Sequence, residues 1–283
     1  MQWGSNGYFG RRRAWRSGPV NRLLDFALSA AGGRCYAAGV ADTLLVNEIF
    51  LSVQGESTFA GLPCVFVRLT GCPLRCSYCD SAYAFHGGRR MVLDHVLGEV
   101  AQYATRFPLS GPAQRLPLVE ITGGEPLVQR PVFDLMRELC DRGFTVLLET
   151  SGAVDIAPVD HRVRRIMDLK CPSSGEAGRN LWSNVLHLRA TDEVKFVIAT
   201  REDYAWTKQA IAQHALDQRC PLLVSWASPL TPGQQDVSLK PIPPGQTPIS
   251  RRELVEALLR DALPVRFQLQ MHKFIWPPDQ TGV

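Results

Sequence analysis

The sequence lacks an apolar run of the roughly 18–20 residues that a membrane-spanning helix needs. It also has little net charge over most of its length. Six arginines and one aspartate give residues 1–40 a net charge of +5, and the whole chain carries +4, so the remaining residues carry −1. A body so close to neutral gives no basis for a nucleic-acid-binding surface. We therefore expect neither a membrane nor a nucleic acid as a partner.

A disulfide framework is also missing. The eight cysteines of this 283-residue chain follow no regular spacing along its length, and a chain of this size does not need disulfides to compensate for a small core. Cys64, Cys140 and Cys220 lie in or beside apolar stretches, which is typical of buried thiols.

The first forty residues differ in composition from the rest. An Arg-rich start precedes a short apolar run from Leu23 to Ala31, in the manner of a signal or transit peptide. Asp25 interrupts that run and argues against this interpretation. We predict that residues 1–40 form a basic, disordered extension and that residues 41–283 form one domain.

From Asn47 onward, β-branched apolar runs alternate with longer amphipathic ones. This alternation predicts βαβ units with parallel strands. Six or seven units are too few for a closed eight-stranded barrel, so we expect an α/β fold, an open partial (β/α) barrel of about six parallel strands. The predicted strands are Glu48–Val53, Val65–Thr70, Leu118–Thr122, Thr145–Glu149, Arg165–Leu169, Glu193–Ile198, Leu222–Ser225 and Phe267–Met271; the predicted helices are Asp94–Thr105, Val132–Asp141, Tyr204–Asp217 and Arg251–Asp261; and Pro229–Pro248 is a long loop, a candidate lid.

Three cysteines carry the strongest signal. Cys72, Cys76 and Cys79 have the spacing C-x3-C-x2-C, which stops at three, whereas a structural zinc site or an ordinary [4Fe–4S] cluster needs four protein ligands. Three thiolates on a four-iron cube leave one iron available to a small molecule. In this the chain resembles the radical S-adenosylmethionine superfamily, which implies a [4Fe–4S] cluster and S-adenosylmethionine as the source of a 5′-deoxyadenosyl radical. Such an oxygen-sensitive cluster favours a reducing, cytoplasmic location.

Other polar motifs follow the predicted strands, where βα barrels place their active sites. The superfamily resemblance implies that Gly124, in Gly123–Pro126, binds the cofactor's methionyl group. It also implies cofactor contacts for Tyr78, Cys79 and Asp80 beside the cysteines, and for Asp168, Leu169 and Lys170 at a later strand end. Alternatively, Asp168 and Lys170 form a buried ion pair. Lys195 likewise either contacts a ligand or forms a buried ion pair. The alternative for Tyr78 is that it shields the cluster.

Two further segments narrow the resemblance. The stretch from Glu48 to Glu56, continued by Phe66–Cys72, and the tail Gln268–Ile275 resemble the 7-carboxy-7-deazaguanine synthase family of queuosine and 7-deazapurine biosynthesis. The resemblance implies that the residues contacting 6-carboxy-5,6,7,8-tetrahydropterin are Val53, Gln54, Gly55, Arg68, Thr122 and Pro278. Arg68 suits the substrate carboxylate, although a salt bridge at the barrel rim is the alternative.

The family resemblance also implies a reaction, a radical ring contraction to 7-carboxy-7-deazaguanine with loss of ammonia, a carbon–nitrogen lyase activity. No catalytic side chain beyond the cofactors is implied. Mg2+ would bind beside the substrate through a threonine hydroxyl, but this chain has Ser81 at that position; a capping role without metal is the alternative. Further implications are a homodimer and reduction by a flavodoxin or ferredoxin.

Three other interpretations stay open at this point. An activase of a glycyl-radical enzyme would share the cysteines but would not need the Gln54–Glu56 or His272-Lys273 motifs. A zinc-binding interaction module would use His86 as a fourth ligand, at an unusual distance from Cys79. An inactive relative would keep the fold alone.

Overall fold

One nine-stranded sheet organises the residues that the structure, a computed structural model, describes: 43–107 and 116–283. The strand order is β3-β1-β2-β4-β5-β6-β7-β8-β9. The strands are β1 (Thr43–Val53), β2 (Pro63–Leu69), β3 (Arg89–Val92), β4 (Leu118–Gly123), β5 (Val146–Thr150), β6 (Arg164–Asp168), β7 (Glu193–Ile198), β8 (Leu222–Trp226) and β9 (Arg266–Gln268). The predicted extension over residues 1–40 lies outside the described residues.

The sheet confirms the predicted open α/β architecture and adds strands to it. Seven strands, β2 and β4 to β9, pair in parallel. β1 pairs antiparallel with β2, and β3 pairs antiparallel with β1. The sequence pattern did not predict β3, because this strand has only four residues, Arg89–Val92, of which two are arginines and three are exposed. The two end strands, β3 and β9, do not pair with each other, so the barrel stays open.

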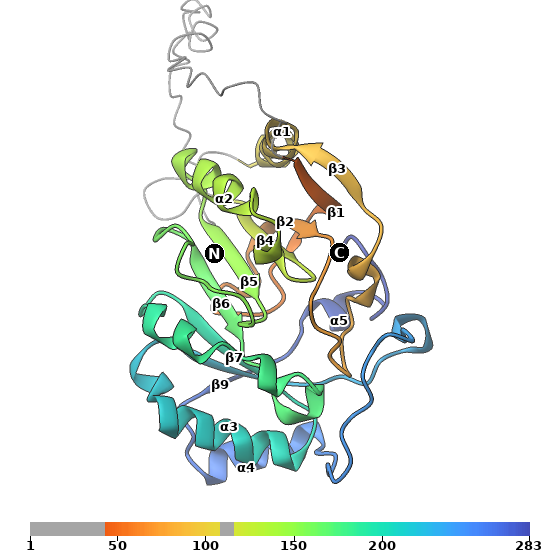
Figure 1. Cartoon of the computed structure of the whole chain (residues 1–283), viewed down its shortest axis with the longest axis vertical. Coiled ribbons are helices and arrows are strands. Elements are labelled where there is room, and N and C mark those ends of the chain that lie inside the picture. The colour runs from red at the N-terminus through yellow and green to blue at the C-terminus, as the bar shows by residue number, and fades with distance from the viewer. Residues whose placement is uncertain (1–42, 108–115) are drawn as a thin grey trace, which may run out of the picture. The chain divides into compact units, whose positions relative to one another are not determined.

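Four helices cover the sheet: α1 (Leu93–Ala104), α2 (Val132–Asp141), α3 (Arg201–His214) and α4 (Arg251–Arg260). Figure 1 shows α1 and α2 near one end of the curved sheet and α3 and α4 near the other. The predicted bounds match closely except at α3, which begins before Tyr204. Thr200 and Asp203 form a capping box there, and this pair of hydrogen bonds starts the helix earlier than its apolar pattern indicates.

Strand alternation separates a large core from the inner face of the sheet. In β4, Val119 and Ile121 pack into the main core under the helices, whereas Glu120 and Thr122 line a cavity. Other residues on this inner face are Arg68, Glu149, Asp168 and Lys195. A small apolar cluster of Cys64, Leu118, Leu147 and Ile166 lies on the same face nearer the strand starts, and it forms the floor beneath the polar residues.

The C-terminal segment departs from the prediction. The strand β9 ends at Gln268, and the chain then turns into the short helix α5 (His272–Ile275), so the predicted strand over Phe267–Met271 is wrong in its second half. The apolar residues Leu269, Phe274 and Ile275 in this segment are exposed. Their presence therefore did not indicate a buried strand.

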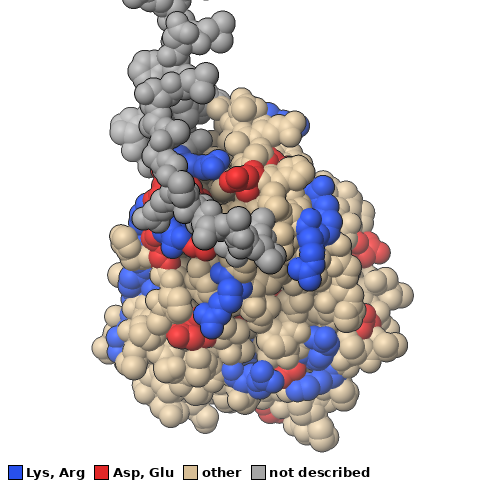
Figure 2. Space-filling model, turned by 45° about the horizontal axis from the view of Figure 1, so that its top comes forward, with Lys and Arg blue, Asp and Glu red and all other residues tan. Residues whose placement is uncertain are grey.

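Two surface features bear on possible partners. Within the described residues, no helix combines the length and apolarity needed to cross a membrane. On the face shown in Figure 2, basic side chains occur in separate groups interrupted by acidic and uncharged ones.

Candidate active site

A cavity of about 430 Å³ opens at the carboxyl ends of the parallel strands. This is the size of a small-molecule site. Every residue predicted to bind substrate, cofactor or metal lines it, with the exception of Leu169: the lining includes Val53, Gln54, Gly55, Arg68, Cys72, Cys76, Tyr78, Cys79, Asp80, Ser81, Thr122, Gly124, Asp168, Lys170 and Pro278. Leu169 is fully buried in the main core. It follows Asp168 and so faces the opposite side of the sheet; a contact through its backbone stays a prediction.

The three motif cysteines lie on one wall of this cavity as free thiols. Burial raises the pKa of Cys76 to about 12 and that of Cys79 to about 11, so both thiols are protonated without a metal and must lose their protons on binding one. Their shared cavity and soft thiol chemistry fit an iron–sulfur cluster. His86 is exposed and is not part of the cavity lining, which gives no support to its role as a fourth zinc ligand.

The Gly123–Pro126 motif packs directly against the cysteine loop. A Cβ atom added to Gly124 would lie 2.2 Å from the carbonyl oxygen of Gly71 and 2.7 Å from Cys72 Cβ, so only glycine fits there. Glu125 is fully buried, and its carboxylate accepts hydrogen bonds from the Ser151 backbone N–H at 2.8 Å and hydroxyl at 2.6 Å. The motif therefore connects the cysteine loop to the end of β5.

Asp168 and Lys170 form the ion pair that was the alternative to a cofactor contact, with Nζ and Oδ2 2.7 Å apart. Burial lowers the pKa of Lys170, but its negative neighbours, led by the Asp168 carboxylate, together outweigh burial, so the net shift is upward and the lysine stays charged. The other oxygen, Asp168 Oδ1, is buried and has no hydrogen-bond partner among the described residues. The ion-pair interpretation and a ligand contact are thus compatible, because one acceptor remains for a hydroxyl or N–H group.

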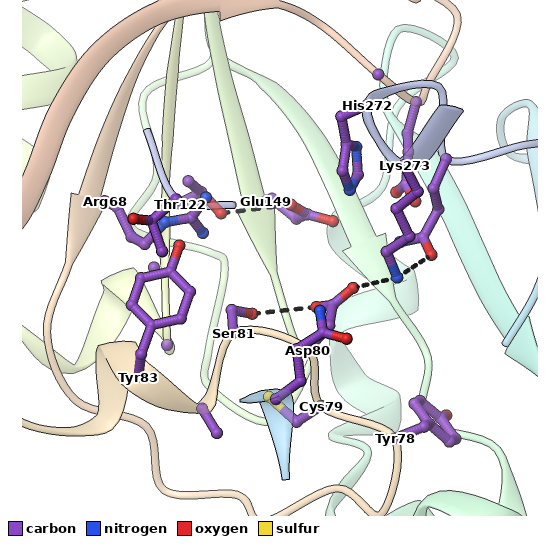
Figure 3. A pocket seen from close by; sticks show the side chains of 18 of the residues that line it. Arg68, Tyr78, Cys79, Asp80, Ser81, Tyr83, Thr122, Glu149, His272 and Lys273 are labelled. Carbon is purple, nitrogen blue, oxygen red and sulfur yellow. Dashed lines mark hydrogen bonds and ion pairs between the residues drawn. The ribbon is translucent and has the colours of Figure 1, made fainter. Parts of the chain in front are cut away.

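The predicted pterin side of the cavity is more elaborate than the sequence indicated. Gln54 donates through Nε2 to Glu120 Oε2 and accepts from the Glu56 backbone N–H at 2.8 Å. Arg68 Nε lies 2.8 Å from Glu48 Oε1, so the rim salt bridge is present while the guanidinium still lines the cavity. Thr122 Oγ1 donates to Glu149 Oε2 at 3.3 Å, as Figure 3 shows.

The C-terminal segment completes the wall. The backbone N–H of Met271 donates to the Gly55 carbonyl oxygen at 3.0 Å, and a Cβ on Gly55 would lie 2.7 Å from His272 Nδ1. Lys273 pairs with Asp80 at 2.6 Å (Figure 3). Burial opposes ionisation of Asp80, but its positive neighbours, led by Lys273, together outweigh burial and the pKa falls to about 2. The two motifs that narrowed the family resemblance therefore lie against each other.

The sequence left two roles open for Ser81, binding Mg2+ or capping a helix, and the structure argues against capping. It occupies the N-cap position of the turn Ala82–Phe85 but makes no side-chain capping hydrogen bond. Its hydroxyl has only a 3.4 Å contact with Asp80 Oδ1 and lines the cavity (Figure 3). An oxygen so placed fits a hard cation that takes few protein ligands.

Sequence reasoning noted Lys195 as ambiguous but did not predict the group of buried ionisable residues in which it pairs. Glu120 and Lys195 are each almost inaccessible, and Glu56 and Glu149 pair with Lys195. Burial and the nearby Glu149 raise the pKa of Glu120 well above its usual value, which favours the neutral form of this carboxyl. The available signal was a charged residue inside an otherwise apolar strand, on the same face as a predicted ligand.

Comparisons with known proteins show which proteins this chain is similar to. A family model described as the radical SAM superfamily matches residues 66–173. The chain is 42% identical over 243 residues to the 7-carboxy-7-deazaguanine synthase of Chlorobaculum tepidum, covering 85% of this chain and 97% of that protein. Identity to the 7-carboxy-7-deazaguanine synthase of Koribacter versatilis is also 42%, over 84% of this chain and 99% of that protein.

A solved structure shares the fold. The crystal structure of QueE from Escherichia coli superimposes with a TM-score of 0.59 at 20% identity, covering 81% of this chain and 95% of that one.

Proposed function

The chain belongs to the 7-carboxy-7-deazaguanine synthase family of radical S-adenosylmethionine enzymes, and on that premise we propose that it converts 6-carboxy-5,6,7,8-tetrahydropterin into 7-carboxy-7-deazaguanine with loss of ammonia. One observation carries the proposal. Three cysteines, the Gln54–Glu56 motif and the His272-Lys273 motif converge on a single cavity although they are far apart in sequence.

The described residues suit both ligands. A [4Fe–4S] cluster held by Cys72, Cys76 and Cys79, with S-adenosylmethionine on it, would supply the radical chemistry. Gly124, Asp168 and Lys170 would hold the cofactor. The protein's remaining task is to position the pterin and keep water away from the reacting carbon.

Recognition of the pterin rests on charge and hydrogen-bond complementarity. Arg68 offers a guanidinium to the substrate carboxylate. Glu56 Oε1 is buried without a hydrogen-bond partner in the described part of the chain, and so it can accept an N–H from the ring. The Gln54 amide is fixed by Glu120 and the Glu56 backbone, which presets the orientation it would present to the pterin edge.

The accessory requirements are also proposals. Mg2+ would bind through Ser81 and the substrate carboxylate. A flavodoxin or ferredoxin would reduce the cluster in the cytoplasm, and the chain would act as a homodimer.

The proposed functional domain is 41–283, with residues 1–40 dispensable for catalysis. Deleting residues 1–40 should leave the turnover number of purified protein within about twofold, because the described part of the chain supplies the cavity lining from Phe50 to Val283. Loss of turnover in a folded truncated protein would contradict this boundary.

The function is tested by anaerobic assay of reconstituted protein with S-adenosylmethionine, a reductant and the carboxylated pterin. We expect ammonia and 7-carboxy-7-deazaguanine in equal amounts. Cys76→Ala should lose both the brown cluster absorbance and turnover, whereas Cys140→Ala, a buried thiol outside the cavity, should keep both. Full activity in Cys76→Ala would end the proposal.

A further inference from the structure

Lys195 lies where carboxylates from three different elements meet. Its side chain is only 6% exposed, and Nζ lies 2.8 Å from Glu56 Oε2 and 4.0 Å from Asp168 Oδ2. It also pairs with Glu149 Oε1. Glu56 follows β1, Glu149 belongs to the end of β5, and Asp168 ends β6. One ammonium therefore connects three parts of the cavity wall.

The three carboxylates have different neighbours. Asp168 pairs with Lys170, and both act electrostatically on Cys76, which places them on the side of the cysteines. Glu149 accepts the Thr122 hydroxyl. Glu56 is tied to Gln54 through its backbone, because its N–H donates to the Gln54 side-chain oxygen. Lys195 thus bridges the side proposed for the cofactor and the side proposed for the pterin.

Charge balance explains why a lysine is needed at this position. Burial lowers the pKa of Lys195, but Glu149, Glu56 and Asp168 together raise it well above its ordinary value, so it stays charged. Without that charge, Glu56 and Glu149 would lose their shared partner in a buried site, and like carboxylates would move apart or take up protons.

The arrangement also leaves acceptors free for ligands. Lys195 engages Oε2 of Glu56 and the same Asp168 oxygen that Lys170 binds. The second oxygen of each carboxylate is buried and has no hydrogen-bond partner among the described residues. Holding one oxygen of each group fixes the direction of the other.

We propose that Lys195 is a positioning residue that holds the cofactor-side carboxylate Asp168 and the substrate-side carboxylates Glu56 and Glu149 in one arrangement, which keeps the two ligands in register. This inference rests on the proposed function, because that function assigns the two sides. In this role Lys195 acts through its three carboxylate partners and not on the reacting atoms. If the pterin moves relative to the cofactor, the cofactor can still be cleaved while less product forms. A misplacement of about 1 Å can cost about a hundredfold in rate.

The test compares Lys195→Met, which keeps an unbranched side chain one atom shorter and removes the charge, with Lys195→Arg, which keeps the charge. Lys208→Met is the matched control, because it removes a lysine 2.6 Å from Asp261 on the surface, away from the cavity. The readouts are 7-carboxy-7-deazaguanine formed per 5′-deoxyadenosine released, the KM for the pterin, the Kd for S-adenosylmethionine and the Tm of cofactor-free protein.

For Lys195→Met we expect product per 5′-deoxyadenosine to fall at least about tenfold and the pterin KM to rise. Lys195→Arg should recover most of the ratio, and Lys208→Met should match the parent. A parent-like ratio and KM in Lys195→Met would overturn the inference, as would a loss of rate that follows Tm alone. If Lys195→Met does not fold, the charge-balanced double variant Lys195→Gln/Glu149→Gln carries the same comparison.

A separate measurement distinguishes failure of this inference from failure of the proposed function. If the parent protein forms no deazaguanine, the proposed function fails. The role of Lys195 is then judged by a double-mutant cycle in Tm between Lys195→Met and Glu56→Gln. Non-additive shifts support the bridging role, and additive shifts overturn it.

Discussion

Ser81 is the residue at which the chain departs from the threonine that its family resemblance implies. The hydroxyl is kept and the methyl group is lost. Since this side chain makes no capping hydrogen bond and lines the cavity, its oxygen is available to a cation. The structure therefore favours a ligand role over a capping role, and Mg2+ dependence can decide the matter.

Replacing Ser81 with Ala should raise the Mg2+ concentration for half-maximal activity by about tenfold or more, because a direct oxygen ligand is lost. Ser81→Thr should keep or lower that concentration. The measurement is a Mg2+ titration of deazaguanine formation in chelator-treated protein. Identical titrations for the parent and Ser81→Ala would show that Mg2+ does not bind there.

Single residues also show where sequence reasoning works and where it stops. Asp168 and Lys170 could be placed on one face from their spacing alone, and the same rule, applied strictly, would have turned the Leu169 side chain away from the cavity. Lys195 could not be assigned, because its partners, Glu56 and Glu149, lie 139 and 46 positions away in the sequence. Long-range pairing of this kind depends on which strands become neighbours.

At the scale of elements, the parallel strands were predictable and the connections were not. Buried strands such as β4 and β7 are rich in Val, Ile and other apolar residues, with one or two charged residues each, so their bounds could be read within a residue or so. The short edge strand β3 and the helix α5 have neither an apolar run nor a helical period. The contacts that close the site, such as Met271 with Gly55, come from these less regular parts.

The cysteine loop is held by a neighbouring connection that the sequence did not mark. Glu176 accepts the Arg75 backbone N–H at 2.7 Å and pairs with Lys240 at 2.9 Å. Lys240, in the loop Pro229–Pro248, donates its own backbone N–H to the Arg75 carbonyl oxygen at 3.0 Å. Ser77 donates its hydroxyl to Ser173 at 2.7 Å. That loop was a candidate lid, and here it anchors the cysteine loop.

Removing this anchor with Glu176→Ala should make a chelator extract iron at least about tenfold faster, because hydrogen bonds to charged groups contribute about 1.5–3 kcal/mol. Glu176→Gln should fall in between, since it keeps an acceptor for Arg75. The decay of the cluster absorbance under anaerobic chelation measures the rate. Glu256→Ala, which removes an exposed i,i+4 pair, is the control; equal rates in Glu176→Ala and the parent would contradict the anchor.

In the whole domain, the carboxyl ends of the strands form the site and the amino ends contribute to stability. The carboxyl ends carry the cavity, as expected for βα folds. Near the amino ends of β6 and β7 lies a buried ion network, in which Asp192 pairs with Arg165 at 2.6 Å and Arg189 at 3.1 Å. Its members are not part of the cavity lining. This network serves stability, and stability can be tested separately from chemistry.

Asp192→Asn should lower the free energy of unfolding at pH 7 by about 3–5 kcal/mol, because it leaves Arg165 buried without its counter-charge. Burial opposes ionisation of Asp192, but hydrogen bonds from Arg165 and Arg189 outweigh it and lower its pKa. A lowered native pKa stabilises the fold above the unfolded value, about 3.9, and the contribution disappears as the pH falls through the native pKa. The difference between the parent and Asp192→Asn should therefore stay constant from about pH 5 to 8 and narrow below about pH 4.

Urea unfolding of cluster-free protein across this pH range measures the effect. Asp141→Asn, which removes a partner of Arg162 that is 51% exposed, is the matched control and should cost less than about 1 kcal/mol. A loss in Asp192→Asn as small as that of the control would show that the network is not a main source of stability. A difference that persists unchanged to pH 3 would show that Asp192 is not the titrating group. The contrast arises because Asp192 has no exposed surface, so water cannot replace the ion pairs that the substitution removes.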